Sequence, residues 1–298
     1  MSVFQIRNEC LTVQIQDLGA QMWSVRDAEG TEYLWQGDEK YWEDRAPNLF
    51  PYIARLTDGK YQLSGKTYGM DIHGFAKDTV FEAEQKSDSH IIFKTQDTEE
   101  TYRQYPYKFV FSISYELADS KLLITYHVKN LSDKEMYFGV GGHPGFQVPF
   151  AENTVFEDYY LEFDKATDVK RVGMSKDCFV TGEDTPFVLE EGIRLPLCHS
   201  LFDDDAIILT DMAKRVKLAS EKVGKEISVT YPDMTYLGIW HRPRTDAPYI
   251  CIEPWSSLPS RKGIVEDLET QPGLISLAAG DEYRNQFEIE VREHVVSK

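Results

Sequence analysis

The sequence contains few cysteines, and none of them forms a pair at the spacing that binds metals. Its 298 residues include four cysteines, at positions 10, 178, 198 and 251, with no C-x-x-C pair. This scatter excludes a zinc ribbon and a disulfide framework, and it favours a reducing compartment. We therefore predict a cytoplasmic protein in which each cysteine packs as a small apolar side chain.

Long apolar runs and an excess of basic charge are also absent. No stretch of about 18 apolar residues occurs, which excludes a membrane-spanning helix, and the N-terminal "MSVFQIRNEC" does not have the pattern of a secretory signal. The 32 Lys and Arg residues are outnumbered by 50 Asp and Glu residues, for a net charge of −18. Nucleic acids and anionic membranes are therefore not expected as partners. A neutral small molecule suits this charge best, because a phosphorylated one would need a local basic pocket.

The sequence shows no amphipathic helix of three or more turns, and its dominant hydrophobic period is two. Apolar and polar residues alternate in residues 10–17, 108–117, 121–130 and 287–292. This alternation is typical of half-buried antiparallel strands. We therefore predict an all-β protein, a large antiparallel β-sandwich with few short helices. No linker-like or low-complexity segment divides the chain, so a single domain over residues 1–298 is expected.

Further elements are expected between turn-forming residues. The additional strand candidates cover residues 89–95, 134–140, 157–164, 225–231, 235–240 and 248–253. Short helical turns are expected near residues 38–44 ("DEKYWED") and 256–263 ("SSLPSRKG").

The segment "GVGGHPGF", residues 139–146, surrounds one histidine with four glycines. It is similar to a phosphate-binding loop, but Pro144 stands where the dinucleotide fingerprint has its third glycine, and no helical pattern follows. Glycines let a backbone approach a ligand closely, and the bond to Pro144 favours an extended His143. His143 is therefore predicted to face an open site. A plain corner between two strands is the alternative.

His73 and Glu253 stand out by their places in the chain. His73 precedes Gly74 in "DIHGFAKD", so it is a second histidine at a flexible corner. Glu253 ends the nearly continuous apolar stretch "PYICI" and is followed by "PW". A carboxylate at the end of a buried strand is costly without a role or a partner, and burial is expected to raise its pKa. A salt-bridged structural glutamate is the alternative.

Arg55 and Asp205 are further candidates for ligand contacts. Arg55 interrupts the apolar run of "NLFPYIARL", and its fork of donors suits a carboxylate, sugar hydroxyls or a phosphate. Asp205 directly precedes a buried strand, but Asp203 and Asp204 compete with it for the same role. A solvated arginine and a turn-capping aspartate are the structural alternatives.

Several reaction chemistries have no support in the sequence. It has no G-x-S-x-G elbow and no H-E-x-x-H motif. His73, His143 and Glu253 could formally supply two histidines and a carboxylate to a metal, which their distant spacing neither supports nor excludes. We expect no metal and no cofactor.

In chain order, an arginine strand, "HGFA", "GGHPGF", "LFDDDA" and "IEPW" resemble the aldose 1-epimerase (galactose mutarotase-like) superfamily. More narrowly, the chain is similar to the LacX-like bacterial branch, whose N-terminal part also reads like "YLWQGDEKYWEDRAPNLFPYIARL". The resemblance implies a β-supersandwich with its site in a cleft on the concave face. It also implies the interconversion of the α and β anomers of a free sugar, without a cofactor.

The resemblance further implies a role for each candidate residue. Glu253 corresponds to the base that takes the proton of the anomeric O1 hydroxyl, and His143 to the acid that protonates the ring oxygen. His73 corresponds to a hydrogen-bond partner near the ring oxygen, while Arg55 and Asp205 correspond to substrate-binding residues. We expect Glu253 and His143 to coexist as carboxylate and imidazolium at working pH.

Two features bear on the choice of sugar. Aromatic rings near the motifs are expected to offer stacking faces, namely Phe75, Phe146, Trp240 and Trp255. Relatives that act on hexose 6-phosphates carry arginine after "HGFA", whereas this chain carries Lys77, which binds phosphate only as a point charge. A free sugar is therefore slightly favoured, and a hexose 6-phosphate mutarotase is the alternative.

Two functions from other classes remain open. The chain could be a carbohydrate-binding protein on the same scaffold, without turnover. It could also be a glycoside hydrolase with Glu253 and Asp205 as its carboxylate pair. In each case the expected partner is a small sugar, and a monomer or homodimer is expected.

Overall fold

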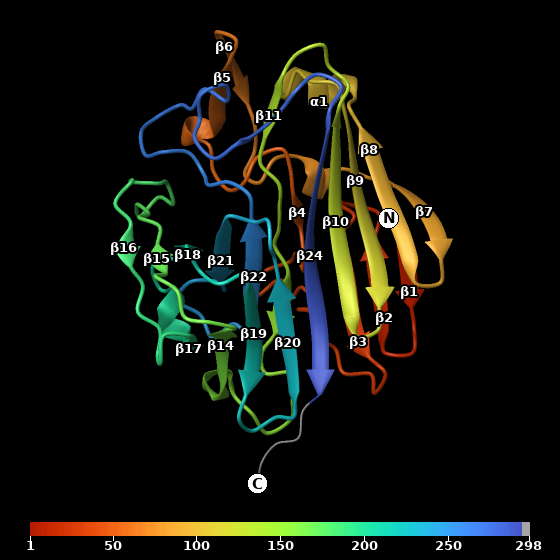
Figure 1. Cartoon of the computed structure of the whole chain (residues 1–298), viewed down its shortest axis with the longest axis vertical. Helices are drawn as coiled ribbons and strands as arrows, with labels where there is room; N and C mark the ends of the chain where they lie inside the picture. Colours follow the sequence, from red (N-terminus) through yellow and green to blue (C-terminus); the bar gives the residue numbers. More distant parts are fainter. Residues whose placement is uncertain (294–298) are drawn as a thin grey trace.

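Antiparallel β-sheets make up nearly all of the regular structure in the computed structural model, which describes residues 1–293 (Figure 1). Two large sheets, of nine and eight strands, are accompanied by three small ones. The all-β class and the antiparallel sandwich predicted from the period-two pattern are therefore confirmed.

The larger sheet has its longest strands, β24, β10 and β9, at adjacent positions. Its nine strands are, in spatial order, β17 (Arg194–Pro196), β14 (Tyr159–Phe163), β19 (Arg215–Ser220), β20 (Lys225–Thr230), β24 (Glu282–Glu293), β10 (Lys121–Asn130), β9 (Phe109–Ala118), β8 (His90–Gln96) and β7 (Glu82–Ser87). The strands expected at 89–95, 157–164 and 225–231 correspond to β8, β14 and β20.

The second large sheet carries the site described below. Its strands are, in spatial order, β16 (Thr185–Pro186), β15 (Lys170–Arg171), β18 (Ile207–Thr210), β21 (Tyr236–Trp240), β22 (Tyr249–Trp255), β12 (Gly141–Gly142) and β4 (Asn48–Leu49), with β13 (Gly145–Gln147) also paired to β22. The expected strands at 235–240 and 248–253 are β21 and β22.

Three small sheets complete the strand inventory of the described chain. They are formed by β1 (Val3–Arg7), β2 (Leu11–Gln16) and β3 (Met22–Asp27); by β5 (Lys60–Leu63) and β6 (Lys66–Gly69); and by β11 (Met136–Phe138) and β23 (Ile275–Leu277).

A single α-helix, α1 (Glu99–Gln104), occurs among residues 1–293. Thr98 caps it, because the Thr98 hydroxyl accepts the backbone N–H of Thr101 and the Thr101 hydroxyl accepts that of Thr98. The 3-10 turns are η1 (Thr57–Gly59), η2 (Ala76–Asp78), η3 (Phe156–Asp158) and η4 (His199–Phe202). No helix in the described part of the chain is long and apolar enough to cross a membrane.

The short helical turn expected near residues 38–44 is confirmed as a single hydrogen-bonded turn, whereas the one expected near residues 256–263 is wrong, because that segment is irregular. In the first, the backbone N–H groups of Tyr41 and Trp42 both donate to the Asp38 carbonyl, and the turn goes no further. The second contains Pro259, which supplies no N–H and restricts the residue before it.

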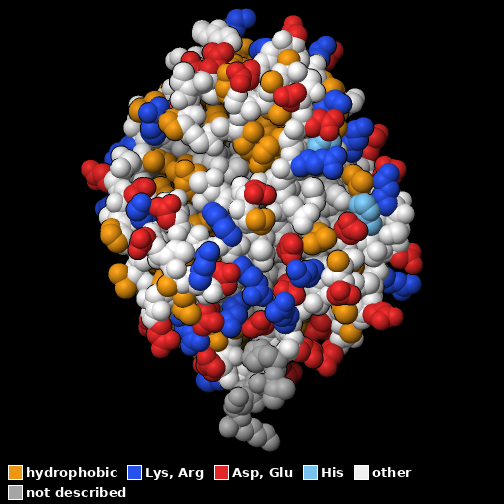
Figure 2. All heavy atoms as spheres, in the orientation of Figure 1, with side chains coloured by type: hydrophobic (Ala, Val, Ile, Leu, Met, Phe, Trp, Pro, Cys, Tyr) orange, Lys and Arg blue, Asp and Glu red, His pale blue; other side chains and the backbone are white. Residues whose placement is uncertain are grey.

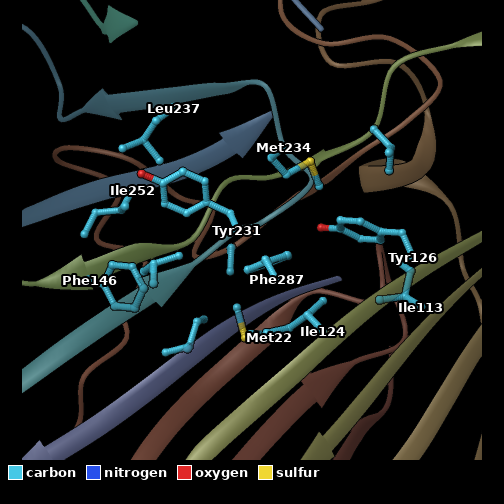
Figure 3. Close-up of a cluster of buried hydrophobic side chains, with 14 of the residues drawn as sticks. Met22, Ile113, Ile124, Tyr126, Phe146, Tyr231, Met234, Leu237, Ile252 and Phe287 are labelled. Carbon is cyan, nitrogen blue, oxygen red and sulfur yellow. The ribbon is translucent and has the colours of Figure 1, made fainter. Parts of the chain in front are cut away.

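Side chains from both large sheets meet in one core. β10 alternates buried and half-buried positions, whereas β22 is buried at every position, as its apolar sequence indicated. Figure 3 shows Ile124 and Phe287 of the nine-stranded sheet in the same cluster as Leu237 and Ile252 of the other sheet. This packing holds β21 and β22 in place where they border the cleft.

The surface carries charges of both signs. On the face seen in Figure 2, acidic and basic side chains are interleaved. On the nine-stranded sheet, Lys217 and Arg194 both pair with Glu162, and Arg215 pairs with Glu290. The negative net charge is therefore not gathered into one unbroken acidic surface on this sheet.

Candidate active site

A cleft of about 360 Å³ borders strands β18, β21 and β22. Its wall includes the site residues that the sequence predicted, which are Arg55, His73, His143, Asp205 and Glu253. These residues come from loops and strand ends far apart in the chain. The fold therefore brings the whole predicted set to one concave surface.

Glu253 and His143 meet at the floor of the cleft. Glu253 lies in β22, and the two short strands that flank His143, β12 and β13, both pair with β22. The register brings the imidazole to the carboxylate, with His143 Nε2 3.2 Å from Glu253 Oε2. Both residues are buried, at 1% exposure for Glu253 and 8% for His143.

Burial shifts the pKa values of this pair in opposite directions. It raises the pKa of Glu253 well above its usual range, and the nearby Asp205 carboxylate adds to the shift, while the Trp255 indole opposes it. Burial also lowers the pKa of His143 to about 4. Both side chains are thus driven toward their neutral forms.

The expected carboxylate and imidazolium are therefore not the favoured resting forms of the free protein. A neutral carboxyl beside a neutral imidazole holds the same number of protons as a carboxylate beside an imidazolium. The two arrangements differ only in where one proton lies along the 3.2 Å contact. The pair is net neutral in both, which is the form that a buried site tolerates.

His73 is fixed as a neutral hydrogen-bond donor. Its Nδ1 accepts the backbone N–H of Ala54 at 3.1 Å, so its proton lies on Nε2. Burial, followed by the charges of His143, Lys77 and Arg55, holds the pKa of His73 well below its usual value. Its ring meets that of His143 edge to face, with centroids 5.5 Å apart. His73 can therefore donate one hydrogen bond beside the acid-base pair.

Two cations border the cleft, and they differ in what they contact. Lys77 is half-buried, and its ammonium forms an ion pair with Asp78 at 2.7 Å. Arg55 is exposed, and within residues 1–293 its guanidinium makes no hydrogen bond or ion pair. Arg55 is therefore the cation that is free to bind a ligand.

Asp205 borders the cleft with its carboxylate partly engaged. Its Oδ1 accepts the backbone N–H of Ala206 at 2.8 Å, and its Oδ2 accepts the thiol of Cys178 at 3.0 Å. Burial first, and then this carboxylate, raises the pKa of Cys178 to about 12. Asp204 also lines the cleft, whereas Asp203 does not.

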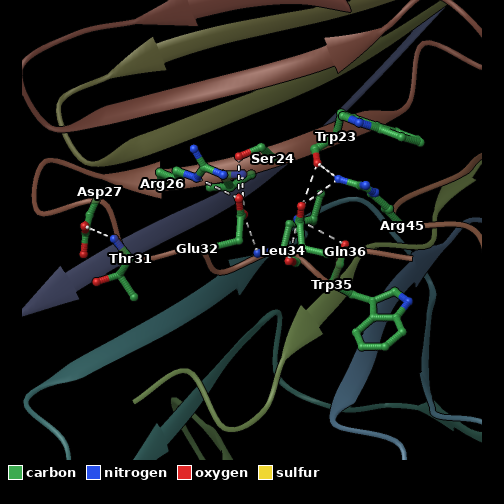
Figure 4. A network of polar contacts seen from close by, with 11 residues as sticks. Trp23, Ser24, Arg26, Asp27, Thr31, Glu32, Leu34, Trp35, Gln36 and Arg45 are labelled. Carbon is green, nitrogen blue, oxygen red and sulfur yellow. Dashed lines mark hydrogen bonds and ion pairs between the residues drawn. The ribbon is translucent and has the colours of Figure 1, made fainter. Parts of the chain in front are cut away.

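Trp42 is a site residue that the sequence did not indicate. Its ring lies against that of His143, with centroids 4.9 Å apart and planes tilted by 32°, and Trp240 meets His143 edge to face at 5.7 Å. The surrounding loop is held by a hydrogen bond from Trp35 Nε1 to the Trp42 carbonyl at 2.8 Å. Its other end is held by Arg45, which donates to Gln36 and the Trp23 carbonyl (Figure 4).

The expected aromatic lining is partly corrected. Trp240 and Trp255 do border the cleft. Phe75 and Phe146 do not, because both are buried in the main core, where Phe75 packs edge to face on Phe50 at 6.0 Å. Their places in "HGFA" and "GGHPGF" reflect packing beneath the two histidine corners.

The metal set of His73, His143 and Glu253 is also not the one that the fold assembles. Among the described residues, the ligand atoms that approach within 4.8 Å of one another at this site belong to His143, Cys251 and Glu253. His73 is not part of this group, and its Nδ1 accepts the backbone N–H of Ala54.

Residues 2–290 match the family model for aldose 1-epimerase. The chain therefore belongs to the aldose 1-epimerase family, as the order of its motifs predicted.

Two relatives of known structure and one sequence relative make this family assignment more specific. A galactose mutarotase related enzyme from Lactobacillus acidophilus shares 34% identity, with a TM-score of 0.93 over 99% of this chain and 98% of that one. A galactose mutarotase-like protein from Lactobacillus casei ATCC 334 shares 33% identity, with a TM-score of 0.92 over 98% and 100%. The chromosomal protein LacX of Lactococcus lactis subsp. lactis is 32% identical over 299 residues, which cover 96% of this chain and 98% of LacX. The fold is thus galactose mutarotase-like, and the chain is LacX-like.

Proposed function

We propose that the protein is an aldose 1-epimerase, which interconverts the α and β anomers of a hexose by opening and reclosing the sugar ring. The observation that carries the proposal is the buried pair of Glu253 and His143, in contact at 3.2 Å on the floor of a cleft of about 360 Å³. O1 and O5 of a pyranose are both bonded to C1, so one base and one acid in contact with each other can reach both oxygens.

Ring opening requires one proton to leave O1 and one to arrive at O5. In the ion-pair form, the Glu253 carboxylate takes the O1 proton while the His143 imidazolium protonates O5, and the C1–O5 bond breaks. The open-chain aldehyde then rotates about its C1–C2 bond. Reclosure on the other face reverses both proton transfers.

The protein returns to its starting form after this cycle. Once the ring is open, Glu253 is a neutral carboxyl and His143 a neutral imidazole, which are the forms that burial favours. The site therefore stabilises the forms that accompany the open-chain sugar. Reclosure returns both protons and regenerates the ion pair, and in the free protein a proton shift from Glu253 to His143 forms this pair before the next ring opens.

Other residues of the cleft would hold the sugar. The Nε2–H group of His73 would donate to the sugar beside the ring oxygen, since its Nδ1 is occupied by the Ala54 N–H. Asp205 would accept from sugar hydroxyls, and Arg55 would donate to oxygens at the mouth. The Trp42 and Trp240 rings would shield His143 from water.

Polarimetry on freshly dissolved α-D-glucose and α-D-galactose tests this proposal. The protein should accelerate the return of optical rotation to equilibrium for at least one sugar of an aldohexose and aldopentose panel. Equilibration at the uncatalysed rate for every sugar of the panel would overturn it.

A hexose 6-phosphate is a second candidate substrate. It is favoured by the exposed Arg55 guanidinium, which pairs with no other group in residues 1–293, and which could bind a phosphate in bidentate fashion. Exchange NMR on glucose 6-phosphate and galactose 6-phosphate, compared with the free sugars, separates the two candidates. A KM that is lower for the phosphorylated sugars than for the free sugars, and that rises in Arg55→Met, would favour a hexose 6-phosphate as the substrate. A KM for the phosphorylated sugars that is equal to or higher than that for the free sugars would exclude it.

A further inference from the structure

A cluster of metal-ligating atoms includes the proposed acid-base pair and one neighbouring cysteine. His143, Cys251 and Glu253 each offer one ligand atom, and these atoms all lie within 4.8 Å of one another. We propose that these three residues bind a thiophilic divalent cation of the Zn²⁺ class, which blocks the cleft floor and inhibits the protein.

Strand register explains why these three residues meet. Cys251 and Glu253 are two positions apart in β22, so their side chains lie on the same face of the strand. Gly145 of β13 pairs with Cys251, which brings the turn containing His143 alongside this stretch of β22. The cluster is thus a product of the rigid eight-stranded sheet, not of mobile surface side chains.

The chemistry of the three ligands suits zinc. A thiolate, an imidazole and a carboxylate are all common Zn²⁺ ligands, at about 2.0–2.3 Å from the metal. In a tetrahedral site such ligand atoms lie roughly 3.3–3.8 Å apart. His143 Nε2 and Glu253 Oε2, 3.2 Å apart, already have nearly this separation. The three ligand atoms all lie within 4.8 Å of one another, and two of the three residues, His143 and Glu253, line the cleft.

A second observation also points to a ligand at this place. Glu253 is 1% exposed, and the contact of its Oε2 with His143 Nε2 at 3.2 Å lacks hydrogen-bond geometry, so this oxygen accepts no hydrogen bond from the described residues. Buried polar atoms are usually paired, because an unpaired one costs free energy. A cation between Glu253, His143 and Cys251 would satisfy this oxygen.

Another candidate cluster in the described chain is already filled. The carboxylates of Asp27, Glu29 and Glu293 also approach one another closely. The ammonium of Lys225 lies among them, at 2.7 Å from Asp27 and 2.8 Å from Glu29. A protein cation therefore occupies that position, whereas among residues 1–293 the basic side chain that pairs with Glu253 is His143.

Coordination would disable the proposed reaction. As the metal binds, the Cys251 thiol releases one proton to water and the Glu253–His143 pair releases its exchangeable proton as well, so that the thiolate, His143 Nε2 and the Glu253 carboxylate give their lone pairs to the metal. Neither group could then exchange a proton with a sugar. The inhibition rests on the proposed function, but the binding does not.

Binding is tested with Co²⁺ as a spectroscopic probe and Zn²⁺ by calorimetry, on full-length protein freed of metal with a chelator and kept reduced. Co²⁺ should produce a thiolate-to-metal charge-transfer band in the near ultraviolet, and Zn²⁺ should bind with a stoichiometry of one. Cys251→Ala should abolish the band and weaken Zn²⁺ at least about tenfold, since losing an outer-shell partner already costs about 10–100-fold. Cys10→Ala, at a half-buried cysteine outside the cleft, should change neither.

Circular dichroism establishes that each variant is folded, and Cys251→Ser is the second variant if the alanine variant is not. No band, or a band that survives loss of the Cys251 thiol, would overturn the site.

In the activity arm, one equivalent of Zn²⁺ should slow anomer exchange at least about tenfold in the parent, and a chelator should reverse it. The ratio of rates with and without Zn²⁺ should return close to one in Cys251→Ala. Stoichiometric binding with an unchanged rate would overturn the inhibition, and a parent without any exchange activity would overturn only the proposed function.

Discussion

At the scale of single residues, burial controls the protonation of the two groups proposed to do the chemistry. The environment raises the pKa of Glu253 and lowers that of His143, so the pair keeps one exchangeable proton over a wide pH range. The pair therefore titrates as a unit, with two apparent pKa values that belong to both residues.

This protonation predicts a broad pH profile for kcat/KM of the free protein. Below about pH 4 His143 also takes up a proton, so the pair has no base and activity falls. At high pH Glu253 loses its proton while His143 stays neutral, so the pair has no acid. This second fall should follow the raised pKa of Glu253 and not the ordinary value of 4.5. Polarimetric rates across this range provide the check. An acid limb near the ordinary histidine value of 6.5, and not near 4, would rule out the buried neutral imidazole.

Trp42 is predicted to position His143. Trp42→Ala would remove the ring that lies 4.9 Å from the imidazole and would admit water beside it. We expect kcat/KM to fall about tenfold or more, because small displacements of a reacting group are costly. Trp42→Phe keeps an aromatic face and should recover most of the activity. An alanine variant with unchanged kinetics and an unchanged pH profile would show that the contact is only structural.

Whether a site residue could be predicted from the sequence depends on whether the residues around it carry a local signal. His143, His73 and Glu253 could be found because glycine corners and a buried strand end are local signals. Trp42 could not, because its polar neighbours carry no such signal, and its position depends on a hydrogen bond to Trp35 in a different segment. The raised pKa of Glu253 was predicted from its place at the end of a buried strand, whereas the lowered pKa of His143 was not, since it depends on how completely that side chain is buried.

At the scale of elements, the glycine segment works through close backbone contacts and not through phosphate binding. A Cβ on Gly141 would lie 2.8 Å from the Pro254 carbonyl oxygen and 2.9 Å from the Trp255 ring. These distances are shorter than carbon contacts allow, so only glycine lets β12 lie so close to β22.

Gly141→Ala is therefore predicted to push β12 away from β22. Unfolding free energy should fall by about 1–3 kcal/mol, as for other overpacked sites, and activity should fall because His143 follows two residues later. Gly69→Ala is the matched control, since its Cβ would meet nothing closer than the Gly59 carbonyl at 3.7 Å. Denaturant unfolding of both variants supplies the comparison. Equal stability of the two would mean that β12 can move without cost.

The strands were predictable for a physical reason, whereas the helix was not. Burial on one face imposes a period of two over many residues, as in β9 and β10, and β22 is buried at every position and apolar except at Glu253 because both of its faces are covered. The six residues of α1 are too few to show a helical period. Its cap at Thr98 and Thr101 is a weaker signal than the periodic strands around it.

At the scale of the whole molecule, Lys225 links the three-stranded sheet to the nine-stranded one. Its ammonium, at the start of β20, donates to Asp27 at 2.7 Å, Glu29 at 2.8 Å and the Thr31 hydroxyl at 2.8 Å, all in or after β3. The Lys225 side chain is 18% exposed, so solvent screens these contacts only partly. The net charge of −18 makes an internal cation at this position more valuable.

Lys225→Met is predicted to destabilise the fold by about 1–3 kcal/mol, because Asp27, Glu29 and Glu293, the last at 3.7 Å, would lose their shared cation. Thermal unfolding at low and at high salt is the measurement, and salt should reduce the deficit. Lys170→Met is the control, because the Lys170–Asp211 pair is half exposed and should matter little. A Lys225→Met midpoint equal to that of the parent would show that the two sheets do not depend on this contact.

The central claim, that Glu253 and His143 open a sugar ring together, is tested most directly by anomer exchange in Glu253→Gln. This variant keeps the size of the side chain but cannot accept the O1 proton. Exchange NMR on the substrate found by polarimetry should show the rate falling by about 10²–10⁴-fold, while calorimetry shows that the sugar still binds. Exchange that persists at the parent rate in Glu253→Gln would contradict the claim.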